Sequence, residues 1–212
     1  MTHLRFALLL LATLFLGACG SSGPLSDPSK ANSKAPETYQ VEFDTTAGKF
    51  VVDVRREWAP LGADRFYNLV KSGFYDNARF FRVVPGFVVQ FGIPASPAVA
   101  KAWGENTVIQ DDPVKQSNAA GFLSFASRGP NTRTTQVFIN LRPNQNLDDM
   151  GFAPFGLVTT GMDVVTKLHS GYGEGAPMGA GPDQQRITAE GEEYLSKEFP
   201  KLDKINRARI LP

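Results

Sequence analysis

Two polar residues, Arg82 and Gln90, interrupt the apolar stretch FFRVVPGFVVQFG at residues 80–92. Aromatic and β-branched residues on both sides of Pro85-Gly86 predict two strands joined by a turn. A guanidinium and a carboxamide are costly to place among Phe and Val unless something there uses them. Because a guanidinium stays charged and donates hydrogen bonds, this pair is suited to stabilising a polar group without proton transfer. The simpler alternative is a pair of side chains on the solvent face of the two strands.

Residues suited to hydrolysis are scarce in this chain. His169 is the one histidine beyond residue 38, Cys19 is the one cysteine, and no G-x-S-x-G or HExxH motif is present. The acidic pairs at residues 111–112 and 148–149 are typical of turns, because adjacent residues of an extended chain point to opposite sides. The sequence therefore predicts neither a metal site nor a cofactor.

Composition excludes other classes of function. The length of 212 residues and the 42% hydrophobic content allow one domain with a sizeable core. The net charge is +1 and no Lys/Arg cluster occurs, so nucleic-acid binding is not expected. The segment GYGEGAPMGAG at residues 171–181 has the glycines of a phosphate-binding loop but lacks the Lys-Ser/Thr that would follow them, and it is interpreted as a surface loop.

The elements that must position Arg82 and Gln90 are short strands. Alternating apolar and polar residues predict a β-hairpin over residues 39–57 and a strand within residues 203–210. Phe66, Leu69 and Val70 have helical spacing and predict one helix of about ten residues, with a second short helix at residues 162–169. Further strands are predicted at residues 79–84, 87–91, 121–127, 136–140 and 155–159, and loops at residues 92–120 and 171–187. Many short strands and two helices favour an antiparallel barrel or sandwich.

Three blocks of sequence together indicate a family. They are RFFRVVPGFVVQFG, GFLSFASRGPNTRTTQVFIN and NLDDMGFAPFGLV, in this order along the chain. Their residues and spacing resemble the cyclophilin-type peptidyl-prolyl cis–trans isomerases, over about residues 39–210. The resemblance implies a mainly β fold: a closed eight-stranded antiparallel barrel capped by two α-helices. It also implies an isomerase that acts on X-Pro bonds and assists protein folding.

The resemblance assigns roles to individual residues. Arg82 corresponds to the catalytic arginine of the family, and Gln90 to the glutamine that supports it. Ala126 and Ser127 lie on the strand that pairs with the peptide, and Gln136 matches the amide that contacts the substrate backbone. The residues that correspond to the walls and floor of the proline pocket are Phe87, Val88, Phe138, Leu147 and Phe152.

The chain departs from the family pattern at three positions. Phe81 stands where many members have histidine, and Phe152 falls near another histidine of the pocket. Asn146 replaces the tryptophan of members that bind cyclosporin tightly, so weak cyclosporin binding is expected. Arg128 and Arg133 flank a turn at the groove, where the simpler interpretation is solvated loop charge.

Prolyl isomerisation agrees with the residues that the chain lacks. No covalent bond breaks, so neither a nucleophile nor a titrating acid is required. Two other classes of function remain open at this stage. One is a module or chaperone that binds proline-containing peptides with little catalysis, and the other is a lipocalin-like carrier, which gives no role to Arg82 or Gln90.

The N-terminal residues predict export. MTHLRFALLLLATLFLGAC has one basic residue, a short apolar run and small residues before Cys19, as in a signal peptide. LFLGAC resembles the lipoprotein processing motif, so residues 1–18 are predicted to be a signal peptide and Cys19 a lipidated residue that anchors the chain to a membrane. The alternative is an ordinary signal with a chance cysteine. Residues 19–38 are predicted to be a flexible tether and residues 39–212 the isomerase domain.

The expected location is therefore a bacterial cell envelope, at the outer membrane and facing the periplasm if the source is Gram-negative. The expected partners are proline-containing peptides and unfolded envelope proteins, and the chain is expected to be a monomer. Whether the loop at residues 171–185 reaches the groove is not determined by the sequence.

Overall fold

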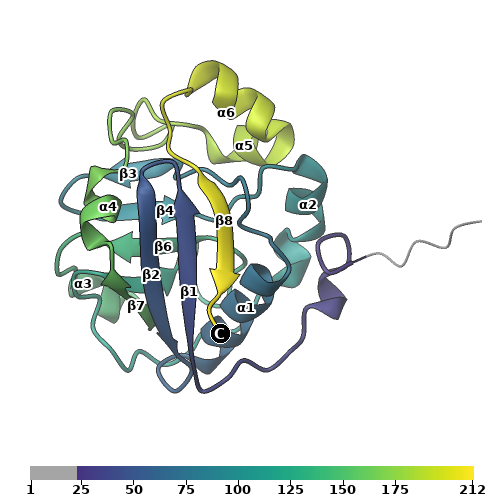
Figure 1. Cartoon of the computed structure of the whole chain (residues 1–212), viewed down its shortest axis with the longest axis vertical. Coiled ribbons are helices and arrows are strands. Elements are labelled where there is room, and N and C mark those ends of the chain that lie inside the picture. Colours follow the sequence, from purple (N-terminus) through teal and green to yellow (C-terminus); the bar gives the residue numbers. More distant parts are fainter. Residues whose placement is uncertain (1–22) are drawn as a thin grey trace, which may run out of the picture.

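The computed structural model describes residues 23–212 as a curved sheet with helices around it (Figure 1). The strands are β1 (Thr38–Thr45), β2 (Gly48–Arg55), β3 (Arg82–Val84), β4 (Val88–Phe91), β5 (Phe122–Phe125), β6 (Val137–Asn140), β7 (Pro154–Thr160) and β8 (Ile205–Ile210). The α-helices are α1 (Pro60–Lys71), α2 (Pro97–Ala102), α3 (Asn146–Asp149), α4 (Met162–Lys167), α5 (Gln184–Glu190) and α6 (Glu192–Glu198), with 3-10 turns η1 (Pro28–Lys30) and η2 (Glu105–Thr107).

The predicted signal peptide, residues 1–18, and the predicted lipidation site, Cys19, lie outside the described residues and stay predictions. A search of residues 23–212 for a helix with the length and apolar character of a membrane span finds none.

The sheet runs in the order β3-β4-β6-β5-β7-β2-β1-β8, and all neighbouring pairs are antiparallel. The predicted hairpin forms with Thr38 opposite Arg55 and Thr45 opposite Gly48. Buried and more exposed residues alternate along both strands of this hairpin, as expected for a sheet with one face on the core.

The sheet is open, which corrects the prediction of a closed barrel. β3 and β8 stand at opposite ends of the strand order, and no ladder joins them within residues 23–212. An isolated bridge between Arg79 and Lys204 lies between the segments that precede these two strands. Backbone bonds from Phe80 N–H to the Asp203 carbonyl and from Ile205 N–H to the Ala78 carbonyl accompany it. Hydrogen bonds therefore link the segment before β3 to residues 203–205, where β8 begins, but β3 and β8 do not form a ladder.

The two predicted helices are α1 and α4, and four more were missed in the described part of the chain. Pro60 begins α1, and Ser72 caps its last turn. His169 lies beyond α4, which ends at Lys167, and not inside it as predicted. The segments expected to be loops contain α2 and most of α5, while α3 forms within the third sequence block. A count of two helices is therefore wrong, because short helices held by tertiary contacts leave little periodic signal.

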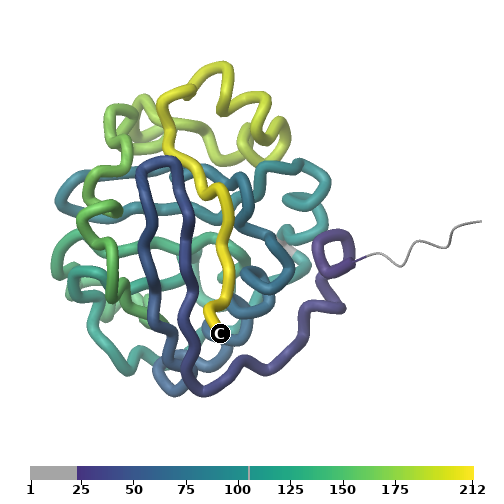
Figure 2. The backbone as a smooth tube through the Cα atoms, in the orientation of Figure 1, coloured from purple at the N-terminus to yellow at the C-terminus, as the bar shows by residue number. Residues whose placement is uncertain are grey.

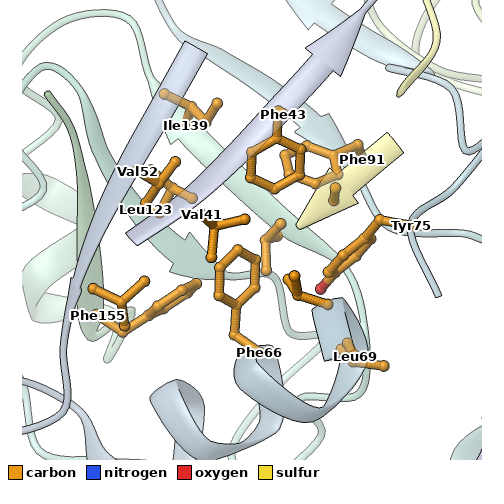
Figure 3. Close-up of a cluster of buried hydrophobic side chains, with 14 of the residues drawn as sticks. Val41, Phe43, Val52, Phe66, Leu69, Tyr75, Phe91, Leu123, Ile139 and Phe155 are labelled. Carbon is orange, nitrogen blue, oxygen red and sulfur yellow. The ribbon is translucent and has the colours of Figure 1, made fainter. Parts of the chain in front are cut away.

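The main core lies between the inner face of the sheet and α1 (Figure 3). Phe43 of β1 stacks on Phe50 of β2 at a centroid distance of 4.8 Å, and Phe66 of α1 packs 4.9 Å from Phe155 of β7. Tyr75 is fully buried, and its hydroxyl donates to the Thr135 carbonyl at 3.0 Å. Phe91 of β4 meets Phe43 edge to face at 5.5 Å, so this core also contacts β4, whose other face carries the predicted site.

The segment at residues 23–37 packs on the domain before β1 begins, as Figure 2 shows. Ala35 is buried, and its N–H donates to Asp64 of α1 at 2.9 Å. Ser33 and Asn68 exchange two hydrogen bonds, from Ser33 N–H at 3.0 Å and from Asn68 Nδ2 at 2.7 Å. Backbone groups of Ser33 and Ala35 therefore have partners on α1, while the tether over residues 19–38 stays a prediction.

A second apolar cluster lies under α5 and α6, at one end of the sheet. Its buried members are Phe81, Ile93, Ile187, Tyr194, Leu195, Phe199 and Leu202, with Tyr172 packed against them. Phe81, which stands where many members of the resembled family have histidine, therefore packs under these helices. Figure 1 shows α5 next to α2, and the two helices are in contact.

Arg133 is buried, which corrects the interpretation of solvated loop charge. Its side chain is 3% exposed, and Nη1 lies 3.1 Å from Oδ2 of Asp112, which is 1% exposed. The same carboxylate accepts from the N–H groups of Leu61 and Gly62 at 3.0 and 2.9 Å, in the first turn of α1. Asp112 is thus more than a turn residue: it joins the start of α1 to the strand segment that leads into β6.

Candidate active site

The pleat of β4 and β6 separates core residues from site residues. Val89 and Phe91 face the main core, whereas Val88 belongs to a separate cluster on the other face. In the register of the sheet, Gln90 lies opposite Arg82 on β3 and opposite Phe138 on β6. Alternation therefore places these three residues on one face, across three adjacent strands.

A row of hydrogen bonds joins the polar residues of this face. Arg82 Nη1 donates to Gln90 Oε1 at 3.0 Å, and Gln90 Nε2 donates to Gln136 Oε1 at 2.8 Å. The guanidinium carbon of Arg82 lies 5.4 Å from the ring centroid of Phe87, within the range of a cation–π contact. The structure thus brings the predicted catalytic pair and the predicted backbone-binding amide together.

Gly92 permits the close approach that places Gln136. Its φ is +107°, and a Cβ there would lie 2.5 Å from the Thr135 carbonyl oxygen and 2.8 Å from Cα of Gln136. Such distances are too short for any side chain, so glycine is required where β4 ends beside the start of β6.

The predicted pocket residues form one apolar cluster next to Arg82. Its buried members are Val88, Phe138 and Leu147, and its partly buried members are Phe87, Ala126 and Phe152. The rings of Phe138 and Phe152 meet edge to face at 5.5 Å. The exposed parts of this cluster give an apolar surface of the kind that a pyrrolidine ring would contact.

A buried amide network holds the loop that carries Leu147 and Phe152. Asn118 Nδ2 donates to Asp148 at 2.7 Å and to the Phe152 carbonyl at 2.8 Å. Asn144 Nδ2 donates to the Phe87 carbonyl at 3.1 Å and to Asn140 at 2.9 Å. Asn118, Asn140 and Asn144 are nearly inaccessible to solvent, so these hydrogen bonds fix the pocket wall against the strands.

The carboxylate of Asp148 is part of this network. Partial burial raises its pKa, but hydrogen bonds from Ser117 and Asn118 outweigh that effect, and the pKa lies below its ordinary value. The group therefore stays ionised near neutral pH and remains an acceptor for the loop.

A groove of about 760 Å³ adjoins the apolar cluster. Gln90, Ala126, Ser127 and Gln136 lie on its wall, so Ala126 belongs to both the groove and the cluster. Gln184, Gln185 and Thr188 from the α5 region also line the groove. The Ala126 N–H donates to the Gln136 carbonyl at 2.9 Å, which joins the two predicted substrate-binding segments.

The segment at residues 171–185 reaches the site, a point that the sequence left open. Glu174 contacts Arg82, and Gln184 and Gln185 line the groove. Sequence reasoning missed these residues because a Gly/Pro-rich stretch has no periodicity that would predict where it folds back. The one available signal was the single acidic residue in GYGEGAPMGAG.

Comparison with protein families gives the decisive observation. The model of the cyclophilin type peptidyl-prolyl cis-trans isomerase/CLD family matches residues 40–190. The chain belongs to this family. It is therefore a cyclophilin-type isomerase, as the three sequence blocks predicted.

Relatives and solved structures agree with this assignment. Peptidyl-prolyl cis-trans isomerase-like 1 of Aspergillus fumigatus is 37% identical over 130 residues, which cover 60% of this chain and 80% of that protein. The protein of the same name from Aspergillus oryzae is 34% identical and is covered to 98%, against 72% of this chain. Peptidyl-prolyl cis-trans isomerase CYP18-2 of Arabidopsis thaliana is 35% identical over 133 residues, which cover 62% of this chain and 80% of that protein.

The fold is similar to that of a Cryptosporidium parvum cyclophilin. Its crystal structure has a TM-score of 0.62 at 21% identity and covers 82% of this chain and 98% of its own. A second structure of this protein, determined in the presence of the dipeptide Ala-Pro, has a TM-score of 0.61 at the same identity.

The relatives overturn the predicted location in a bacterial cell envelope. They are isomerases of fungi, a fission yeast and a plant, and not bacterial envelope lipoproteins. The prediction relied on the first residues of the chain, whereas the relatives match the isomerase domain. We correct the predicted location on this finding.

Proposed function

We propose that this cyclophilin binds a peptide across the groove with its proline ring on the apolar cluster, and that Arg82 is the catalytic donor to the rotating amide. The observation that carries the proposal is the position of Arg82. Its guanidinium is held by Gln90, lies over the Phe87 ring and adjoins the cluster of Val88, Phe138 and Leu147. One side chain can therefore donate to an amide whose proline ring is gripped beside it.

Amide rotation explains why these groups suffice. Resonance imposes a barrier of about 18–20 kcal/mol on the prolyl C–N bond, and spontaneous exchange takes tens to hundreds of seconds. A half-time of about a millisecond requires roughly five decades of acceleration, or about 7 kcal/mol. As the amide twists, the prolyl nitrogen regains its lone pair and becomes a better acceptor. A donor positioned in advance therefore stabilises the twisted state more than either planar state.

The remaining residues have supporting roles in this proposal. Gln136 binds the peptide backbone, and Ala126 and Ser127 present the groove wall along which the chain extends. A related structure determined in the presence of Ala-Pro supports a proline peptide as the occupant. The expected substrates are unfolded proteins whose X-Pro bonds limit folding.

A refolding experiment tests the folding role against the binding-module alternative. The full chain is added to a protein whose slow refolding phase is limited by proline isomerisation, which takes seconds to minutes without a catalyst. We expect acceleration at substoichiometric concentrations, because one enzyme molecule serves many clients. Acceleration that requires stoichiometric amounts, or improved yield at an unchanged rate, would favour a chaperone with little catalysis.

We also propose that cyclosporin binds weakly, because Asn146 is an exposed amide at the start of α3 where tight binders have tryptophan. The variant Asn146→Trp should gain about tenfold in affinity, or about 1.4 kcal/mol, from an added aromatic contact. Titration calorimetry measures the change, and Asn146→Leu tests whether any apolar residue suffices. Equal, tight binding by the wild type and Asn146→Trp would contradict the proposal.

A further inference from the structure

Glu174 and Gln90 accept hydrogen bonds from different nitrogens of the Arg82 guanidinium. Arg82 Nε donates to Glu174 Oε1 at 2.5 Å and Nη2 donates to Glu174 Oε2 at 2.8 Å, while Nη1 donates to Gln90. The two carboxylate oxygens thus form a bidentate pair with one edge of the guanidinium, the geometry of the stronger ion pairs. The Arg82 side chain is 20% exposed and the Glu174 side chain 37%, so the ion pair lies at the surface of the site and is accessible from it.

The loop at residues 171–181 is folded closely around Glu174. The Glu174 carbonyl accepts from Gly181 N–H at 2.8 Å, and its Oε1 accepts from Gly175 N–H at 3.0 Å. A Cβ at Gly179 would lie 2.4 Å from the Glu174 carbonyl oxygen, and one at Gly181 would lie 2.7 Å from it. Side chains at these two positions would displace Glu174, so the glycines of this loop serve to place it.

Both ends of the loop are anchored. The Tyr172 ring packs edge to face on Phe199 at 5.0 Å, in the cluster under α5 and α6. At the other end, Asp183 caps α5 by accepting from Gln185 and Arg186 N–H. Glu174 is therefore held by a folded loop, and the hydrogen bond from Arg82 keeps its pKa below the ordinary value against a smaller effect of burial. The carboxylate is ionised at neutral pH.

Two N–H groups of Arg82 remain available to a substrate. A guanidinium has five N–H groups, and the contacts with Glu174 and Gln90 use three of them. One N–H remains on each terminal nitrogen. A long side chain with many rotamers is thus fixed in advance, and these two N–H groups remain available.

We propose that Glu174 is a positioning residue for the isomerase reaction, which orients Arg82 from the edge opposite Gln90. The inference rests on the proposed catalytic role of Arg82. A guanidinium that is fixed in advance stabilises the twisted amide most effectively, because no free energy is then lost in ordering the donor during the rotation. The loss of Glu174 should accordingly lower kcat more than it raises KM. The opposite possibility is an inhibitory carboxylate that competes with the substrate carbonyl, and this predicts a gain in rate.

The test is steady-state kinetics on the full chain with a proline-containing test peptide. For Glu174→Ala we expect kcat to fall about tenfold and KM to stay within about twofold. Glu174→Gln retains an acceptor for Arg82 and for Gly175 N–H, and its kcat should lie between those of the wild type and Glu174→Ala. The matched control is Glu192→Gln, which breaks the bidentate pair of Glu192 with Arg79 in the same region without touching the groove. That variant should keep the kcat and KM of the wild type.

A double variant separates this inference from the proposal on which it rests. If Glu174 acts through Arg82, then Glu174→Ala has no further effect on kcat in an Arg82→Ala background. An unchanged or increased kcat in Glu174→Ala, with Arg82→Ala inactive, would overturn the inference and leave the proposed function intact. Full activity in Arg82→Ala would overturn both. Equal losses in Glu174→Gln and Glu192→Gln would indicate a structural effect and would also overturn the inference.

Discussion

Replacing Arg82 with alanine should lower kcat/KM for prolyl isomerisation by about 10²–10³-fold, the usual effect of removing one preorganised donor. In the apolar cluster and on the groove wall, Phe87 and Gln90 contact the guanidinium but Val88, Phe138 and Leu147 pack on one another, so affinity for a proline-containing peptide should change by no more than a few-fold. Arg82→Lys should also lose most activity. An ammonium is a point charge that cannot bond Gln90, Glu174 and a substrate in one plane.

Arg79→Ala is the matched control for this prediction. Arg79 lies three positions before Arg82 and forms its own bidentate pair with Glu192, at the edge of the C-terminal helices. Its removal should lower the free energy of unfolding without changing kcat/KM below the unfolding transition. A protease-coupled isomerisation assay measures the rates, and peptide titration followed by NMR measures Kd. Undiminished turnover in Arg82→Ala would disprove the catalytic role, whatever its effect on binding.

Replacing Arg133 with alanine should lower the free energy of unfolding by about 3–5 kcal/mol, because it leaves the buried carboxylate of Asp112 without its cation. Asp112 also accepts from Leu61 and Gly62 N–H, so the loss extends to the first turn of α1. Arg133→Met should recover part of the loss by restoring apolar volume, but not the charge pair. Denaturant unfolding followed by circular dichroism measures the effect.

Arg207 provides the control for Arg133. It lies on β8 with an exposed side chain, and Arg207→Ala should change the free energy of unfolding by no more than about 0.5 kcal/mol. The sequence-based alternative, a solvated arginine at the rim of the groove, makes a different prediction for Arg133→Ala: a raised KM and unchanged stability. That result would show that the ion pair with Asp112 is dispensable.

The sequence was sufficient for the parts of the fold that depend on local pattern. Alternation predicted the hairpin of β1 and β2, and the polar interruptions in FFRVVPGFVVQFG predicted that Arg82 and Gln90 share a face. Side chains alternate between the two faces of a strand, so the face of each residue follows from its position along the strand. The register of the sheet then places Phe138 on the same face, opposite Gln90. The assignment of pocket walls needed the family resemblance, because periodicity alone does not distinguish Val88 from a core residue.

Tertiary contacts decided what the sequence did not predict. Arg133 resembles an ordinary turn residue until Asp112 folds against it from another loop. The α5 and α6 helices are each seven residues long, too short to be marked by propensity, and they form because Ile187 and Leu195 cover Phe81. Glu174 acquires its partner Arg82 only when the loop at residues 171–181 has folded back on the site. Long-range burial and ion pairing, and not local preference, produced these differences.

The place of β8 in the sheet has a consequence for biosynthesis. This last strand completes the free side of β1, one of the first elements to be made. While the chain is still on the ribosome, β1 therefore has its partner β2 on one side and an open edge on the other. Such edges invite pairing with other chains. We expect the nascent protein to become protease-resistant only after its C-terminal residues have left the exit tunnel.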